Sequence, residues 1–188
     1  MTALAARKDL GAPLRWTAPF AFAAIGAVYA LAVGLGAEPI QALAIAPVAI
    51  VCAAIAEIDR RHYLIPDLLV AALACVAALF PLADPKEALV GALCIGGLFL
   101  AVRQGFASAG RADALGLGDV KLATAMGLLL GLQFGLIAVA FAGLATLAVA
   151  APAALSARHG AAAIKIPFGI GLAAALTAIT IVLIWGGL

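Results

Sequence analysis

The chain has 188 residues, of which 67% are hydrophobic and 11% are charged, with a net charge of +2. Soluble domains are closer to half apolar, so this composition and a mean hydropathy of +1.24 exclude a mainly soluble protein. The small net charge gives no support for nucleic-acid binding. The apolar residues come in runs of about 20, the length that crosses a hydrocarbon core. The sequence therefore predicts an all-α fold, a polytopic transmembrane helix bundle.

Seven helices are expected along the chain. They are placed at residues 17–36, 39–58, 66–82, 87–104, 119–132, 134–155 and 167–186. Loops containing Pro, Gly and charge separate them at 36–39, 83–87 and 105–118. The first apolar run is longer than a usual signal sequence and further spans follow it. It is therefore interpreted as an uncleaved first helix.

The uncharged stretch 122–155 forms either one long helix or two shorter ones. Four residues weaken its middle: Gly127, Gly131, Gln133 and Gly135. A break gives seven helices, and a continuous helix over 119–155 gives six. With a break and an inner N-terminus, ten of the 11 basic residues lie at the inner face and only Lys86 lies outside, a strong positive-inside bias. An unbroken helix would carry Arg158 and Lys165 outside, so the charge pattern favours the break.

Two aspartates stand at the edges of apolar runs, where carboxylates are costly and usually functional. Asp59 follows the second predicted helix and Asp119 begins the fifth, after Gly116-Leu117-Gly118. The predicted topology brings both to the inner face. With about 14 residues the fifth helix is roughly 21 Å long, so Asp119 is expected in a water-filled recess below the membrane surface. The pair predicts a shared site for acid–base chemistry on water.

Each of these features also has a purely structural explanation. An aspartate at a helix start complements the helix dipole and accepts free N–H groups, which applies to Asp119 and to Asp67. Residues 60–62 are interpreted as an interfacial basic loop. Lys121 either neutralises Asp119 or meets lipid phosphate, and Glu57 points either into the bundle or to the interface.

The three cysteines lie alone in three different apolar runs, at Cys52, Cys75 and Cys94. Without a CxxC pair they indicate neither a zinc site nor a disulfide framework. They are interpreted as small apolar residues at helix interfaces. No metal and no cofactor are expected.

Three segments taken together resemble the type IV prepilin peptidases, membrane aspartyl proteases of the GXGD type. In family order they are Asp59 with Ile65-Pro66-Asp67, then Gly116 to Leu122, then Ile166 to Gly169. The resemblance implies that Asp59 and Asp119 are catalytic. It also implies a substrate-binding set, namely Gly116, Gly118, Lys121, Pro167, Phe168 and Gly169.

The chain departs from this family pattern in two places. Asp67 stands where the family commonly has Asn. Larger members carry a cytosolic insertion with paired CxxC motifs, linked to N-methylation of the new pilin terminus, and this chain has no such pairs. The resemblance is thus to short, peptidase-only forms such as those serving Flp pili.

The resemblance implies a membrane-embedded endopeptidase that removes the short basic leader of Flp-like prepilins. It would act at the cytoplasmic face of a bacterial inner membrane, with a cytoplasmic N-terminus and no methyltransferase activity. Residues 1–188 would form one peptidase domain with a catalytic core at about 39–188. The implied partners are the prepilin, the lipid bilayer and the pilus assembly machinery, and no nucleic acid. Glu57, Asp67 and Asp113 are candidates to attract the basic leader.

Other functions fit parts of the pattern. Intramembrane carboxylates and broken helices also mark the ion paths of a small proton-coupled transporter, although both acids lie at one face and no inverted repeat is visible. A non-catalytic subunit of a secretion machine is a further alternative. A presenilin-like protease would carry Pro-Ala-Leu near its end, where this chain has Pro167-Phe168-Gly169.

Overall fold

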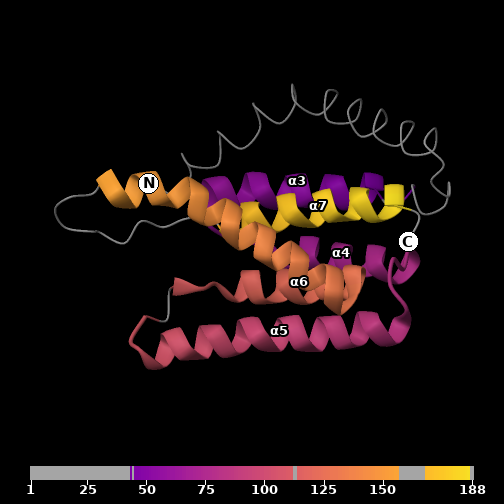
Figure 1. The fold of residues 1–188 in the computed structure, drawn as a ribbon, viewed down its shortest axis with the longest axis horizontal. Coiled ribbons are helices and arrows are strands. Elements are labelled where there is room, and N and C mark those ends of the chain that lie inside the picture. The colour runs from indigo at the N-terminus through magenta and orange to yellow at the C-terminus, as the bar shows by residue number, and fades with distance from the viewer. Residues whose placement is uncertain (1–42, 44, 112–113, 157–167, 187–188) are drawn as a thin grey trace, which may run out of the picture.

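The computed structural model describes residues 43, 45–111, 114–156 and 168–186. This part of the chain is helical, as predicted. Its helices are α3 (Ile45–His62), α4 (Asp67–Leu79), α5 (Pro85–Ser108), α6 (Leu117–Ser156) and α7 (Phe168–Gly186). α3 packs against α7, α6 packs against α4, α5 and α7, and α5 forms the far side of the bundle (Figure 1). The helix predicted at 17–36 lies outside the described residues.

α6 contains the predicted break, and the break falls at Gly131. The backbone there is non-helical, with φ 73° and ψ −174°, a conformation that is essentially restricted to glycine. Beyond Gly131 the chain runs back toward the end of the bundle where α6 began (Figure 1). The expectation of two helical segments in place of one continuous helix is therefore confirmed.

Among the described residues, three helices are long and apolar enough by length and composition to cross a membrane. They are Pro85–Ser108, Leu117–Ala148, which includes the reversal at Gly131, and Phe168–Trp185. Their outward side chains are large and apolar: Leu93 is 67% exposed and Leu147 is 66% exposed. Apolar surface on this scale is unusual on a soluble monomer. The fold is that of an all-α membrane bundle.

The core takes one fully buried large side chain or more from every described helix: Ile55, Leu73, Ile95, Met126 and Leu176. Between α5 and α6 the backbones themselves touch. A Cβ atom on Gly91 would lie 2.5 Å from the carbonyl oxygen of Gly127. Small residues allow such close approach between membrane helices, so α5 and the first part of α6 form a tightly packed pair.

Several predicted helix ends were wrong. α3 continues to His62, so residues 60–62 form its last turn and not a loop. Glu57 pairs with Arg60 and Arg61 one turn further on, and basic side chains also suit the negative end of a helix. α5 covers Pro85–Ser108 in place of 87–104, and α4 covers Asp67–Leu79 in place of 66–82. Gly105 does not stop α5; the chain turns at Gly110, where φ is 73°.

Candidate active site

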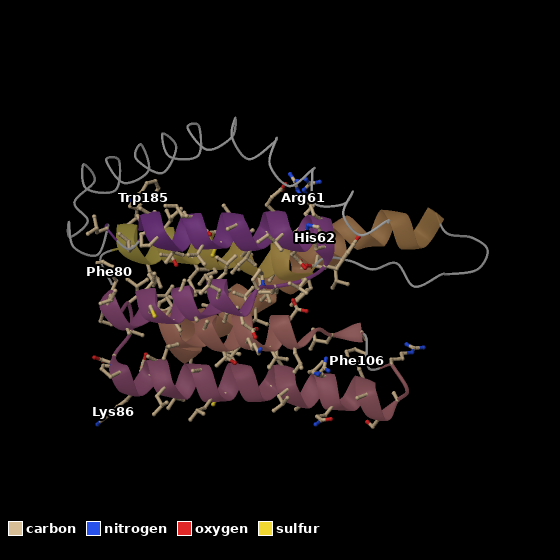
Figure 2. All side chains as sticks on the ribbon, turned by 180° about the vertical axis from the view of Figure 1, so that it is seen from behind. Arg61, His62, Phe80, Lys86, Phe106 and Trp185 are labelled. Carbon is tan, nitrogen blue, oxygen red and sulfur yellow. The ribbon has the colours of Figure 1, made fainter. Side chains whose placement is uncertain are left out.

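Asp59 and Asp119 lie at the same end of the bundle. Figure 2 shows Arg61, His62 and Phe106 at this end, and Phe80, Lys86 and Trp185 at the other. Asp59 is in the last turn of α3 and Asp119 is in the first turn of α6. Ile65 links the two: it lies against Gly169, which contacts the carboxyl group of Asp59, and against Gly118, the residue before Asp119.

Asp59 is buried, with 5% of its surface exposed. Its backbone carbonyl accepts the N–H of Tyr63 at 2.9 Å, and Tyr63, the first residue after α3, has a φ of 51°. The backbone of Gly169 and Ile170, in the first turn of α7, lies against its carboxyl group. Among the described residues, Oδ2 of Asp59 has no hydrogen-bond partner. A buried carboxyl oxygen left unpaired is uncommon, and a catalytic role is one explanation for it.

Gly169 is in direct contact with this carboxyl group. A Cβ atom on Gly169 would lie 2.7 Å from Oδ2 of Asp59, so the absence of a side chain is what makes room for the acid. The neighbouring Phe168 packs on Phe99 of α5, with ring centroids 6.0 Å apart. Pro167, the remaining residue of this motif, lies outside the described residues.

Asp119 is partly exposed and accepts the backbone N–H of Gly116 on Oδ2 at 3.2 Å. This bond is the helix-capping role that the structural explanation predicted. It engages one carboxyl oxygen and fixes the side chain in the first turn of α6. A capping role and a chemical role are therefore compatible for this residue.

Ile65 connects the three motif segments, a role that the sequence reasoning missed. A Cβ atom on Gly118 would lie 2.9 Å from Cβ of Ile65, and one on Gly169 would lie 2.9 Å from Cδ1 of Ile65. This one buried side chain therefore fills the space between the starts of α6 and α7, next to Asp59. Its position in Ile65-Pro66-Asp67 was a signal, but that segment was interpreted mainly as a helix start.

Lys121 has a partner that neither sequence interpretation foresaw. Its Nζ lies 2.7 Å from Oδ1 of Asp67, so it joins the start of α6 to the start of α4. Glu57, whose role was left open, is paired with Arg60 and Arg61. Its charge is thus already balanced within α3. Asp113 lies outside the described residues.

The cysteines do not all lie at helix interfaces. Cys52 is buried, but Cys75 and Cys94 are exposed, which corrects the interface interpretation for these two. Both stand on outward faces of their helices, where a small apolar side chain also fits against lipid. In the part of the chain that the structure describes, no group of three or more His, Cys, Asp or Glu side chains is placed to hold a metal ion.

The fold and the site together define a multi-pass membrane protein with two carboxylates gathered at one end of its helix bundle. Residues 46–151 match the type IV leader peptidase family, and this match includes both aspartates. The chain therefore belongs to the type IV leader peptidase family. It is a prepilin peptidase, a hydrolase whose substrate is a prepilin. Comparison with curated proteins and with solved structures gave no match.

Proposed function

We propose that this protein is a GXGD-type aspartyl prepilin peptidase whose catalytic pair is Asp59 and Asp119. The observation that carries the proposal is the meeting of three distant segments around Ile65, with the buried Asp59 against Gly169 and with Asp119 directly after Gly118. Family membership supplies the reaction class, and this geometry supports the choice of residues. The substrate contacts proposed are Gly116, Gly118, Lys121, Pro167, Phe168 and Gly169.

The reaction is hydrolysis of the peptide bond after the leader. One carboxylate takes a proton from water, and the water oxygen attacks the scissile carbonyl carbon while the other, protonated, carboxyl group polarises that carbonyl. As the C–N bond breaks, the departing amine receives a proton from the pair. Two neighbouring carboxylates do not both ionise easily. They titrate as a unit, and neither is assigned as the base.

We further propose that the site faces the cytoplasm and that the substrate is a Flp-like prepilin. The distribution of charge supports the orientation, because the basic side chains of the described helices gather at the end that holds the acids, while Lys86 stands at the other (Figure 2). The lack of CxxC pairs supports a short form without methyltransferase activity. Residues 1–188 would then form one peptidase domain, with a catalytic core at about 39–188.

The test is a cleavage assay in which a Flp-type prepilin is expressed together with wild-type enzyme, Asp59→Asn or Asp119→Asn, and its mass is followed. Asp84→Asn is the matched control, because Asp84 is exposed before α5, at the opposite end of the bundle. We expect leader loss with wild type and Asp84→Asn only. The product should lack the methyl group of about 14 Da that a methyltransferase would add.

Two results would count against the proposal. Normal cleavage by either of the site variants would remove that aspartate from the catalytic pair. No cleavage by wild-type enzyme that is properly inserted would exclude this prepilin as the substrate. Proton flux in proteoliposomes, lost in the same variants, would then support the transporter alternative.

A further inference from the structure

Arg103 lies on α5, outside the three motif segments, yet it reaches Leu115, just before the helix α6 that carries Asp119. Its Nη1 donates a hydrogen bond to the backbone carbonyl of Leu115. Arg103 is partly buried, whereas Arg60 and Arg111 at the same end are exposed. Hydrogen bonds within the protein offset part of the cost of burying a charged group, and this contact is one such bond for the partly buried guanidinium.

The carbonyl of Leu115 belongs to the same peptide group as the N–H of Gly116. That N–H donates to Oδ2 of Asp119 at 3.2 Å. The described chain has no cis peptide bond, and in a planar trans peptide the C=O and N–H point in opposite directions. One hydrogen bond therefore links the guanidinium of Arg103 to the Leu115–Gly116 peptide group. A second links that peptide group to the carboxylate of Asp119.

This connection has a geometric and an electrostatic consequence. Holding the carbonyl fixes the plane of the peptide, which sets the direction of the N–H and so the position of the carboxylate. A cationic donor also polarises the peptide, and hydrogen bonds in series strengthen one another.

We propose that Arg103 is a positioning residue of the peptidase, which orients the carboxylate of Asp119 through the Leu115–Gly116 peptide. The inference rests on the proposed function of Asp119. It assigns no contact between Arg103 and the substrate. Its role is to hold the Leu115–Gly116 peptide, and with it the carboxylate of Asp119, in place.

The test compares Arg103→Ala, Arg103→Lys and Arg111→Ala as full-length enzymes in detergent with a Flp-type prepilin. We expect Arg103→Ala to lower kcat about 10- to 100-fold, the effect of losing one hydrogen bond from a charged donor, with little change in KM. Added guanidinium ion should restore part of this kcat. The kcat of Arg103→Lys should lie between those of wild type and Arg103→Ala, because lysine keeps the charge but lacks the planar fork. Arg111→Ala, an exposed neighbour, should behave as wild type.

Wild-type kcat in Arg103→Ala would overturn the inference. So would a loss that neither guanidinium nor Arg103→Lys restores, since this would mean that Arg103 serves only folding or insertion. Asp119→Asn, measured alongside, separates the two proposals. If it cleaves normally, the proposed catalytic pair fails; if it is inactive while Arg103→Ala is fully active, the positioning role alone fails.

Discussion

Gly169 is the residue at which packing and the proposed chemistry meet most closely. A methyl group there would stand 2.7 Å from Oδ2 of Asp59 and 2.9 Å from Cδ1 of Ile65. Both neighbours are buried, so the carboxyl group and the start of α7 must move apart. Displacing a catalytic group by about 1 Å costs on the order of 100-fold in rate. We expect Gly169→Ala to lower kcat for leader cleavage by about this factor.

Gly97→Ala is the matched control for this substitution. A Cβ atom on Gly97 meets nothing within 4 Å, and its helix should gain up to about 1 kcal/mol from the better helix former. Its cleavage rate should equal that of wild type. Equal rates for the two alanine variants would show that the contact with Asp59 is unimportant for the reaction.

The pair formed by Asp67 and Lys121 is expected to matter little for stability. The two side chains are 73% and 48% exposed, and exposed ion pairs contribute about 0–1 kcal/mol. A double-mutant cycle of Asp67→Asn and Lys121→Gln, followed by thermal unfolding in detergent, should give a coupling free energy within this range that shrinks in high salt. A coupling free energy well above this range would mean that the pair holds α4 and α6 together. The Asn that the family commonly has at position 67 would then not be equivalent to Asp67 in this chain.

At the scale of elements, the reversal of α6 depends on Gly131. Its φ of 73° and ψ of −174° are strained for any other residue, at a cost of about 1–3 kcal/mol. A Cβ atom there would also lie 3.1 Å from Cβ of Ala83. We expect Gly131→Ala to lower the free energy of unfolding by at least this amount. Gly143→Ala is the control in the same helix, since a Cβ there meets nothing within 4 Å. Equal free energies of unfolding for Gly131→Ala and Gly143→Ala would show that the reversal of α6 does not require glycine at position 131.

The elements also show what the sequence could predict and what it could not. The break in α6 was predictable, because weak helix formers cluster around Gly131 and the basic residues require a reversal. The extension of α3 to His62 was open to prediction from the spacing of Glu57 with Arg60 and Arg61. The contacts of Ile65 and Arg103 were not, since they join segments far apart in the chain. Only the packing of α3, α5, α6 and α7 determines them.

At the scale of the whole molecule, an alternating path of helices brings the acids together. α3 arrives at the end that holds the site, α4 leaves it, α5 returns, and α6 starts there (Figure 1). The reversal within α6 brings the chain back to the same end, where α7 begins with Phe168 and Gly169. Each proposed site residue that the structure describes therefore stands near a helix end, and the site depends on the topology as much as on any single contact.

This topology predicts which side of the membrane the site faces. Asp84 and Ser108 mark the two ends of α5, and both are exposed. Each can be changed to Cys in an active background in which Cys52, Cys75 and Cys94 are replaced by Ala. In intact spheroplasts an impermeant maleimide should label Asp84→Cys, because the end with few basic residues faces outward. Ser108→Cys should react only after lysis. The opposite pattern would put the acids at the outer face and exclude cleavage of leaders in the cytoplasm, while labelling of both from outside would mean that α5 does not cross the membrane.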